Sequence, residues 1–455
     1  MVHETITQQR TFFATDATKD IAFRVAQLER LHQVVRDHEK QLCDAIYADF
    51  GKSPHETYMT ELALFYHEVK TAIRKLRKWS KPRRVFTGLA NFPARSYIQP
   101  EPYGTVLIIG AWNYPYQLTL VPLVAALAAG NTAVIKPSEL PARTAQALAE
   151  VVAMVFPSEQ VAVVQGGVEV TTTLLEERWD KIFFTGSTAV GKLVYHAAAR
   201  YLTPITLELG GKSPAIVLRD CDVAMTAKRL VWAKLLNAGQ TCVAPDYVLI
   251  ERPVYDQVVA AIKKEMEQYP QQASAMGENY LRIINERHTD RLAALIQTSQ
   301  VTFGGAVDRG QRFVAPTLVE EVRWEDPIMQ EEIFGPVLPV MPFDDLETEI
   351  QRIREGAKPL SLYVYSNDHH RIGRVMKRIP FGGGCVNDSN MHLSNSRLPF
   401  GGVGESGMGS YHGYHGFVNF SHMKGILHKA FWLETPIKYA PYTSWKRKLI
   451  EWLVE

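Results

Sequence analysis

Short apolar runs alternate with helical stretches between residues 104 and 187. The runs at 104–110, 131–139, 161–167 and 181–187 contain β-branched residues and are closed by glycine or proline, as expected of strands buried on both faces. Helical stretches lie between these runs, at 118–130, 142–155 and 170–178. Strands that alternate with helices over short connections form parallel sheets. The sequence therefore predicts an α/β fold with a doubly wound parallel sheet.

The flanking segments extend this pattern on both sides. Apolar residues recur at three- and four-residue steps across residues 18–50 and predict a helix there. The basic, proline-containing stretch at 78–86 breaks this spacing and predicts a connection. A second series of strands and helices is expected to begin at 205–218, with a helix over about 223–237.

Two glycine-rich regions and the last residues of the chain do not follow the alternating pattern of strands and helices. Residues 380–390 and 398–416 contain too many turn-forming residues for ordinary core elements, and glycine there allows left-handed turns or close backbone approach. Residues 444–455 predict a short, amphipathic, basic helix. Docking on a partner subunit is the favoured role of this helix, and weak peripheral contact with a membrane surface is the alternative.

The composition excludes several classes of protein. Hydrophobic residues make up 46% and charged residues 22% of the 455 residues, which suits about two or three globular domains and excludes a disordered chain. The 50 basic and 48 acidic residues leave a net charge of +2, which gives no electrostatic sign of a nucleic-acid partner. No apolar stretch is long enough for a transmembrane segment, and the first ten residues do not resemble a secretory signal. We therefore expect a cytoplasmic protein.

Scattered cysteines and partial motifs argue against several kinds of site. The four cysteines form no C-x-x-C pair, which disfavours a disulfide framework, a zinc ribbon and a thioredoxin-like site. Residues 402–407 match G-x-G-x-x-G, but no strand pattern precedes them and no apolar helix follows. Residues 186–192 approach a P-loop, but Leu193 stands where a magnesium-binding Ser or Thr belongs. His412 and His415 lack further ligands nearby in sequence, so no metal site is expected.

Three residues stand out as candidates for chemistry. Cys242 follows a Gly-Gln-Thr turn, where it is either a buried thiol or a thiolate nucleophile on a constrained turn. Glu208 lies on the polar face of a strand in apolar surroundings, which would raise its pKa and suit it to accept a proton; the alternative is an ion pair with Lys212. Asn113 follows the first strand at the mouth of the open sheet, where it either faces a ligand or serves a turn before Pro115.

Seven segments in one fixed order resemble the aldehyde dehydrogenase superfamily, and more closely its class 3, fatty aldehyde dehydrogenase-like branch. The segments are GAWNYP (110–115), KPSE (136–139), FTGSTAVGK (184–192), LELGGKSP (207–214), GQTCVAP (239–245), EEIFGP (331–336) and LPFGGVGESGMG (398–409). The resemblance covers nearly the whole chain from about residue 10 onward. Any one of these strings is modest evidence, but seven in order are very specific.

The resemblance implies NAD(P)-dependent oxidation of an aldehyde, medium- or long-chain aliphatic or aromatic, to the carboxylic acid. Cys242 would form a thiohemiacetal with the aldehyde carbon, and Asn113 with the backbone N–H of Cys242 would hold the developing oxyanion. Hydride transfer to the nicotinamide would leave a thioester, and Glu208 would activate the water that releases the acid.

The resemblance also implies a cofactor site. Glu332 would hold the nicotinamide ribose with Phe334 packed nearby, and Lys136 and Glu139 would lie near the adenosine ribose. The other positions matched to cofactor contacts are Ile109, Ala111, Trp112, Thr185, Gly186, Ser187, Gly191, Leu209 and Gly210. A carboxylate at Glu139 accepts hydrogen bonds from a ribose diol and repels a 2′-phosphate, which favours NAD. Class 3 relatives often use both cofactors, so NADP stays open.

The implied fold is a Rossmann-like cofactor domain, a second α/β catalytic domain and a small dimerisation extension. The expected boundaries are 1–80 and 103–207 for the cofactor domain, 208–400 for the catalytic domain that carries Cys242, and 81–102 with 401–455 for oligomerisation and bridging. Class 3 relatives are typically homodimers. Candidates for the lining of the aldehyde tunnel are Tyr116, Trp232, Asn237 and His412.

Two other functions remain open. An acylating dehydrogenase would pass the thioester to coenzyme A, but such an enzyme needs no base for water, and Glu208 is present. A non-catalytic structural protein on the same scaffold would be expected to lack Cys242 or Glu208, and both are present. Hydrolytic aldehyde oxidation is therefore preferred.

Overall fold

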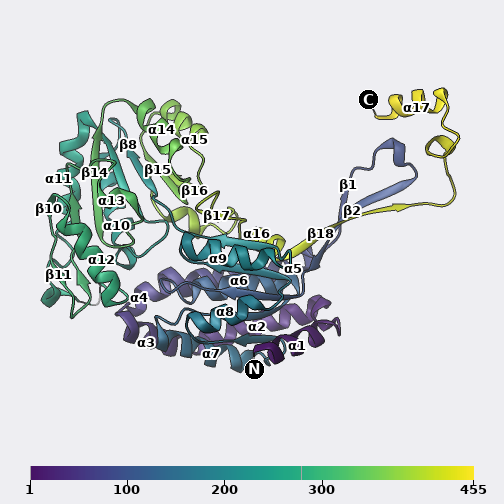
Figure 1. Ribbon diagram of the computed structural model, residues 1–455, viewed down its shortest axis with the longest axis horizontal. Helices are drawn as coiled ribbons and strands as arrows, with labels where there is room; N and C mark the ends of the chain where they lie inside the picture. The colour runs from purple at the N-terminus through teal and green to yellow at the C-terminus, as the bar shows by residue number, and fades with distance from the viewer. Residues whose placement is uncertain (1, 278, 455) are drawn as a thin grey trace.

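The computed structural model describes residues 2–277 and 279–454. Two α/β units lie against each other, and a narrow arm of strands projects away from them and carries the last helix at its tip (Figure 1). Each unit is built on a mainly parallel sheet. The predicted α/β fold with a doubly wound parallel sheet is confirmed.

One unit contains a six-stranded sheet that carries the four strands expected between residues 104 and 187. Its strands, in spatial order, are β17 (Gly407–Met408), β7 (Ile205–Glu208), β6 (Lys181–Thr185), β3 (Thr105–Ile109), β4 (Thr132–Lys136) and β5 (Val161–Val163). All of them run parallel except β17, which pairs antiparallel with β7. From β3 the chain proceeds outward through β4 to β5 and then returns to β6 on the other side of β3, so the strand order reverses between β3 and β6.

Helices cover this sheet. They are α1 (Val2–Phe13), η1 (Ala17–Lys19), α2 (Ile21–Asp37), α3 (Glu39–Phe50), α4 (Pro54–Thr57), the π-helical turn η2 (Tyr58–Leu62), α5 (Ala63–Trp79), α6 (Gln117–Ala129), α7 (Ala142–Val155), α8 (Val168–Glu176), α9 (Thr188–Ala199) and α16 (Gly413–Asn419). The single helix expected over residues 18–50 is wrong, because the backbone leaves the helical conformation at His38. The ring of His38 lies within hydrogen-bond distance of the Val34 carbonyl, and two helices replace one.

The apolar helix α6 is buried along its whole length, which explains why its sequence lacks a polar face. It packs against α2, α5 and the six-stranded sheet. Its end is set by Gly130, whose φ of 99° lies in the left-handed region that glycine adopts without strain. The helix end predicted from the sequence is therefore confirmed.

The other unit contains a seven-stranded sheet. Its strands, in spatial order, are β10 (Val301–Phe303), β13 (Thr317–Val319), β14 (Val337–Phe343), β9 (Tyr247–Glu251), β8 (Pro214–Val217), β15 (Ser361–Tyr365) and β16 (Gly383–Val386). The remaining elements of this unit are α10 (Val223–Leu235), η4 (Leu236–Gly239), η5 (Arg252–Val254), α11 (Tyr255–Met266), η6 (Ala273–Ala275), α12 (Glu286–Gln297), β11 (Val307–Asp308), β12 (Phe313–Val314), α13 (Pro327–Gln330), α14 (Leu346–Glu355), α15 (His369–Arg378) and η7 (Met391–Ser394).

Two expectations about this region need correction. Residues 205–218 do not open a single second series, because β7 completes the six-stranded sheet and β8 enters the seven-stranded one. The Gly210–Gly211 turn carries the chain from one sheet to the other. Part of the glycine-rich segment 380–390 is a regular edge strand, β16, since glycine lets its backbone approach β15 closely.

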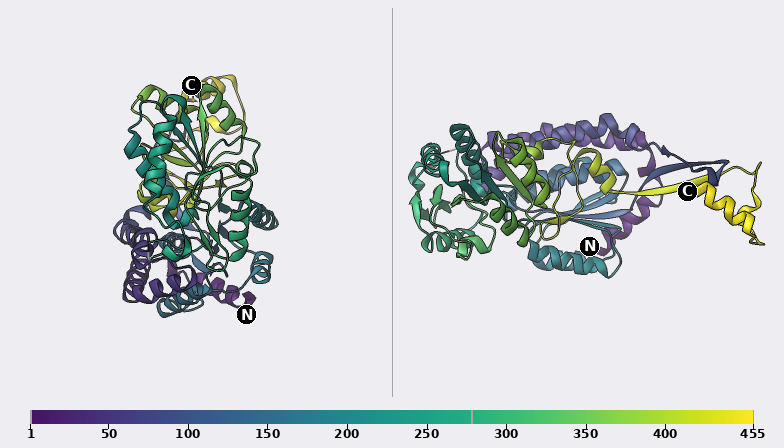
Figure 2. Two further views of the ribbon diagram at one scale, coloured as in Figure 1. Left: turned by 90° about the vertical axis from the view of Figure 1, so that its left-hand side faces the viewer. Right: turned by 90° about the horizontal axis from the view of Figure 1, so that it is seen from above.

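The projecting arm is a three-stranded antiparallel sheet with an attached helix (Figure 2). It consists of β1 (Arg83–Val85), η3 (Leu89–Asn91), β2 (Ala94–Pro102), β18 (Ser421–Lys429), η8 (Pro436–Lys438) and α17 (Ser444–Val454). Part of the connection expected at 78–86 is therefore the edge strand β1, while the C-terminal helix is confirmed up to residue 454; residue 455 lies outside the described residues. The domain boundaries stay a prediction. From the segment 401–455, β17 pairs with β7 of the six-stranded sheet, and α16 packs against α5 and α6 of the same unit and against β18 of the arm.

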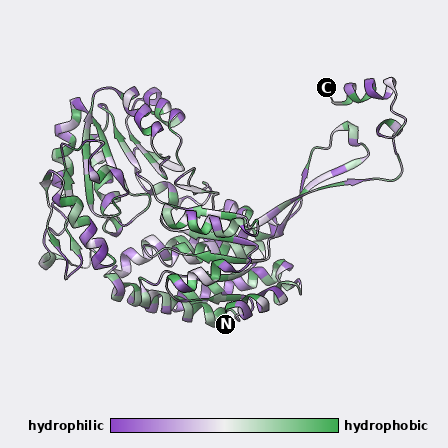
Figure 3. Cartoon of the chain, in the orientation of Figure 1, coloured by the Kyte–Doolittle hydropathy of each residue, from purple (hydrophilic) through white to green (hydrophobic). Residues whose placement is uncertain are grey.

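Apolar residues are concentrated in the central strands of both sheets and on the helix faces that pack against them (Figure 3). Within residues 2–277 and 279–454, none of the helices combines the length and the apolar character that crossing a membrane requires.

Candidate active site

The carboxyl ends of four parallel strands bring several predicted site residues to one edge of the six-stranded sheet. Ile109 of β3 is paired in register with Lys136 of β4, and Thr185 of β6 with Glu208 of β7. Because β3 and β6 are neighbours, all four residues lie along the same edge. The strand order reverses between β3 and β6, and open α/β sheets bind ligands at the carboxyl ends next to such a reversal.

Glu208 lies at the end of β7 with only 4% of its surface exposed. Neither of its carboxylate oxygens has a hydrogen-bond partner among the described residues. Burial without a compensating cation raises its pKa well above the usual value. The ion pair with Lys212 that the sequence left open is not formed, because Lys212 bonds to Asp246 instead.

The loop that carries Cys242 has an unusual backbone. Asn237 and Ala238 have φ values of 55° and 50°, and Gly239 follows with 73°. A left-handed conformation costs a non-glycine residue about 1–3 kcal/mol, so surrounding contacts must hold the loop in place. A side chain at Gly239 would overlap the carbonyl of Gly335, which requires glycine at that position.

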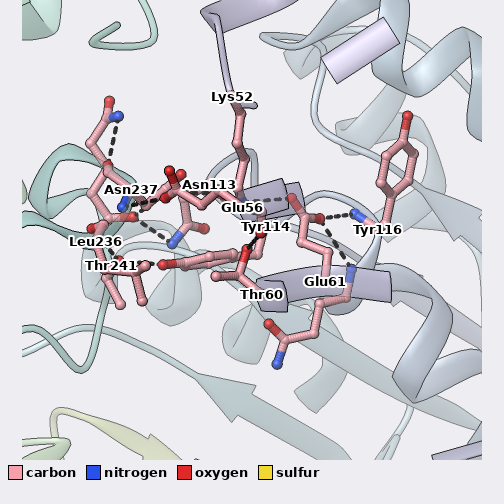
Figure 4. Close-up of polar contacts among 12 residues, drawn as sticks. Lys52, Glu56, Thr60, Glu61, Asn113, Tyr114, Tyr116, Leu236, Asn237 and Thr241 are labelled. Carbon is pink, nitrogen blue, oxygen red and sulfur yellow. Dashed lines mark hydrogen bonds and ion pairs between the residues drawn. The ribbon is translucent and has the colours of Figure 1, made fainter. Parts of the chain in front are cut away.

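Hydrogen bonds join this loop to the segment that carries Asn113. The Asn237 amide donates to the Asn113 carbonyl at 3.0 Å, and the Asn113 amide donates to the Gln240 carbonyl at 3.0 Å. The next residue of each segment adds a further contact. Tyr114 follows Asn113, Thr241 follows Gln240, and Tyr114 Oη lies 2.5 Å from Thr241 Oγ1 (Figure 4). The side chain of Asn113 therefore faces the cysteine loop.

The thiol of Cys242 is partly buried in an environment that disfavours its anion. Burial, followed by the carboxyl groups of Glu332 and Glu208, raises its pKa to about 12, while the N–H groups of Cys242 and Val243 oppose that rise. Both carboxyl groups therefore act electrostatically against ionisation of the thiol. A nearby proton acceptor or a positive charge is needed to activate the thiol at neutral pH.

Glu332 extends over the glycine turn that follows Glu208. A side chain at Gly210 would overlap its carboxylate, and the N–H of Gly211 donates a hydrogen bond to it. Its Oε1 atom is buried and has no partner in the described part of the chain. Burial raises the pKa of Glu332 to about 8, with a further contribution from Asp246. This carboxyl group is positioned to accept a hydroxyl hydrogen from a ligand.

Two of the predicted cofactor positions, Trp112 after β3 and Phe334 on the seven-stranded unit, form an aromatic cluster with His288 of α12. The ring centroids of Trp112 and Phe334 are 5.3 Å apart, and that of His288 lies 5.5 Å from Trp112. Phe334 has a φ of 50°, so its backbone is held in the left-handed region. Burial lowers the pKa of His288 to about 4, which keeps the ring neutral. His288 was not predicted, because it lies in a charged amphipathic helix that carries no motif.

Lys136 and Glu139 form a pair beyond the end of β4, with Nζ and Oε2 3.0 Å apart. Burial alone would raise the pKa of Glu139, but hydrogen bonds from its own backbone and from Lys136 hold it below its usual value. Glu139 is therefore a carboxylate at neutral pH and a good acceptor for hydroxyl groups.

The start of α9 fits a phosphate-binding role. Ser187 caps this 12-residue helix by accepting from the N–H of Val190, and the hydroxyl of Thr185 just before it is buried without a partner among the described residues. Helix N-termini stabilise anions through free N–H groups and the helix dipole. A side chain at Gly191 would overlap Leu209, so glycine lets α9 approach the chain that follows β7.

The four candidates for the aldehyde tunnel have different environments. Asn237 lies beside Asn113 in the cysteine loop. Tyr116 is fully buried and donates its hydroxyl hydrogen to a carbonyl of α3, so it does not face the loop. His412 is buried against Phe400, and burial lowers its pKa to about 3. Trp232 lies on α10 and is partly buried.

Comparison with known proteins shows what this arrangement is similar to. Residues 1–426 match the family model described as "Aldehyde dehydrogenase family". The solved structure titled "Substrate bound state of Staphylococcus Aureus AldH" superposes with a TM-score of 0.97 at 42% identity, and all of both chains are covered.

Curated relatives match over nearly their whole length. The 4,4′-diaponeurosporen-aldehyde dehydrogenase of Staphylococcus aureus is 43% identical, over 97% of each chain. Aldehyde dehydrogenase family 3 member B1 of Rattus norvegicus is 45% identical, over 96% of this chain and 94% of the relative. The dimeric NADP-preferring aldehyde dehydrogenase of the same species is 42% identical, over 94% and 95%. The chain therefore belongs to the aldehyde dehydrogenase family and is an enzyme that oxidises aldehydes with NAD(P).

Proposed function

We propose that this enzyme oxidises medium- and long-chain aliphatic or aromatic aldehydes to carboxylic acids, with water as the final acyl acceptor. The observation that carries the proposal is the carboxyl group of Glu208, which lies buried at the end of β7 without a hydrogen-bond partner among the described residues and raises the pKa of the Cys242 thiol. A coenzyme A-acylating enzyme needs no such base. The 43% identity to the 4,4′-diaponeurosporen-aldehyde dehydrogenase supports a large apolar aldehyde as substrate.

In the first step, the Cys242 thiol gives up its proton to water, Sγ bonds to the carbonyl carbon of the aldehyde, and the π bond between that carbon and its oxygen breaks. The carbonyl oxygen gains negative charge, and the backbone N–H of Cys242 and the amide of Asn113 stabilise it. The amide nitrogen of Asn113 has two hydrogens. One is donated to Gln240, which fixes the orientation of the amide, and the other remains for the oxyanion.

The cofactor site combines the residues at the edge of the six-stranded sheet with Glu332. A nicotinamide cofactor held there would supply the acceptor for the hydride that leaves the thiohemiacetal carbon. The unpartnered Oε1 atom of Glu332 would accept a hydrogen bond from the nicotinamide ribose, and Lys136 with Glu139 would hold the adenosine ribose. The N-terminus of α9 at Ser187 would hold the pyrophosphate through its free N–H groups and the helix dipole.

The thioester is then hydrolysed. Glu208 takes a proton from a water molecule, the water oxygen bonds to the thioester carbon, and the carbon–sulfur bond breaks. Cys242 recovers a proton and the carboxylic acid leaves. The burial that raises the pKa of Glu208 makes its carboxylate a stronger proton acceptor than an exposed one.

The proposal is tested by following the absorbance of the reduced cofactor with a series of aldehydes. Chain length should be varied and aromatic aldehydes included, with NAD or NADP and with or without coenzyme A. Acid formation without coenzyme A is the expected result. Strict dependence on coenzyme A would instead identify an acylating enzyme. Inactivity throughout, with the Cys242 thiol intact, would indicate a non-catalytic scaffold.

We expect the replacement Glu139→Ser to weaken discrimination against NADP. The carboxylate accepts ribose hydroxyls but repels a 2′-phosphate, so its removal should lower the ratio of NAD to NADP affinity by about 10-fold. Titration of each cofactor against intrinsic fluorescence measures that ratio. Glu355→Ser, at the end of α14 on the other unit, is a control that should leave it unchanged. An unchanged ratio in Glu139→Ser would show that other residues select the cofactor.

We also propose that the enzyme is a cytoplasmic homodimer. The arm leaves Phe86, Phe431 and Trp432 largely exposed, and a second copy of the chain would cover such aromatic side chains. Light scattering should give twice the mass of the chain. A monomer that sediments with lipid vesicles would favour the alternative, in which α17 makes weak contact with a membrane surface.

A further inference from the structure

Three charged residues next to the active site have no part in the steps above. Lys52 and Glu61 are fully buried, and Nζ of Lys52 lies 2.8 Å from Oε1 of Glu61. Glu56 on α4 is partly buried beside them. All three belong to the segment 52–61 of the six-stranded unit (Figure 4), here called the 52–61 clamp.

One side of the clamp holds the segment that carries Asn113. Glu61 Oε2 accepts a hydrogen bond from the backbone N–H of Tyr116 at 2.8 Å. The ammonium of Lys52 lies 4.2 Å from the ring centroid of Tyr114, within the range of a cation–π contact. Tyr114 in turn reaches Thr241, the residue before Cys242.

The other side holds the cysteine loop itself. Glu56 Oε1 accepts a hydrogen bond from the backbone N–H of Asn237 at 2.7 Å. Asn237 is the first of the three residues with positive φ, and its side chain donates to the carbonyls of both Asn113 and Gln240. The hydrogen bond to Glu56 Oε1 therefore holds the backbone of Asn237, where the left-handed part of the cysteine loop begins.

We propose that Glu56 is a positioning residue for the oxidation, because by holding Asn237 it sets the distance between the Cys242 thiol and the amide of Asn113. The inference rests on the roles proposed for Cys242 and Asn113. Lys52 and Glu61 fix the Asn113 segment from the opposite side, so the clamp joins two loops that belong to different sheets. Without Glu56, the left-handed residues can relax to an ordinary backbone conformation and carry Cys242 away from the oxyanion donors.

The replacement Glu56→Ala tests the proposal, with Glu56→Gln as its conservative counterpart. Alanine removes the acceptor of the Asn237 N–H, and kcat is expected to fall by about 10- to 100-fold with an unchanged KM for the cofactor. Glutamine retains an acceptor oxygen at the same distance and is expected to restore most of kcat. The rate at which iodoacetamide alkylates Cys242 is measured as well, because that readout does not depend on turnover.

Glu251 provides a matched control. It is 1% exposed and accepts the backbone N–H of Arg219 at 2.7 Å, but it lies at the end of β9 that is remote from Cys242. Glu251→Ala is expected to lower the melting temperature without changing kcat or the alkylation rate. If Glu251→Ala changes kcat and the alkylation rate of Cys242 as Glu56→Ala does, the role of Glu56 is only structural and the proposal fails.

The remaining outcomes also decide the question. The inference is overturned if Glu56→Ala keeps the wild-type kcat and the wild-type alkylation rate. It is also overturned if Glu56→Gln loses as much of kcat as Glu56→Ala. If the alanine variant does not fold, Glu56→Asp replaces it, since one methylene less withdraws the acceptor while most of the volume is kept. A wild-type enzyme that oxidises no aldehyde would contradict the proposed function instead, while the alkylation rates would still compare the variants.

Discussion

Replacing Cys242 by alanine is expected to abolish aldehyde oxidation, with a fall in kcat of about 10⁴-fold or more. Of the described cysteines, Cys242 is the one whose thiol is influenced by both Glu208 and Glu332. Without its sulfur, no thiohemiacetal forms and the carbonyl carbon cannot release a hydride. Steady-state formation of the reduced cofactor measures the loss, and mass spectrometry of the quenched enzyme shows whether an acyl adduct accumulates.

Two other cysteines serve as controls for this prediction. Cys221 and Cys385 are partly buried, and burial raises the pKa of each without a catalytic carboxyl group nearby. Their alanine variants are expected to retain wild-type turnover. The Cys242→Ala variant itself should still bind NAD, because Lys136, Glu139 and Glu332 remain in place. Turnover that survives in Cys242→Ala would remove this residue as the nucleophile.

The sequence predicted the parallel sheet well, because its strands are short apolar runs with a local pattern. The strands β3, β4 and β6 and the helix α7 lie where the pattern places them. The break at His38 was not predicted, since α2 and α3 present apolar residues at the same spacing on either side of it. The division between β7 and β8 was also missed, because strand pairing between distant segments leaves no trace in a local pattern.

In the candidate site too, the sequence reveals the residues that stand in motifs but not the contacts between distant segments. Asn113, Glu208, Cys242 and Glu332 stand in motifs that the resemblance identifies. In the structure, Asn113 bonds to the loop that carries Cys242, and both glutamates raise the pKa of its thiol. Glu56 stands in no such motif, and its importance is visible only from the hydrogen bond to Asn237, 181 residues further along the chain. Positioning residues of this kind are found from tertiary contacts, whereas residues that touch the reacting atoms are often found from sequence motifs.

Replacing Glu208 by glutamine is expected to separate the two halves of the reaction. Glutamine has nearly the same size but cannot accept a proton from water, so hydrolysis of the thioester should slow by about 10²- to 10⁴-fold. Hydride transfer does not need this base. A burst of reduced cofactor, close to one per active site, should therefore precede a slow steady state in rapid-mixing experiments.

The pH dependence of hydrolysis gives a second test of Glu208. Burial raises the pKa of its carboxyl group, so the group is protonated at a pH where an exposed glutamate would be ionised. Only the ionised form accepts a proton, and the hydrolysis rate of the wild type should therefore rise with pH towards the raised pKa. Glu208→Gln should lack this rise.

Glu68 is a matched control, because it is also buried and burial raises its pKa to about 7, but its carboxylate accepts the N–H of Gly413 on α16. Glu68→Gln is expected to keep the wild-type pH profile and the wild-type steady-state rate. A Glu208→Gln variant without a burst at saturating aldehyde and cofactor would show that Glu208 acts earlier, as the base that deprotonates Cys242. The raised pKa of that thiol makes this outcome chemically reasonable, and the burst amplitude distinguishes the two roles directly.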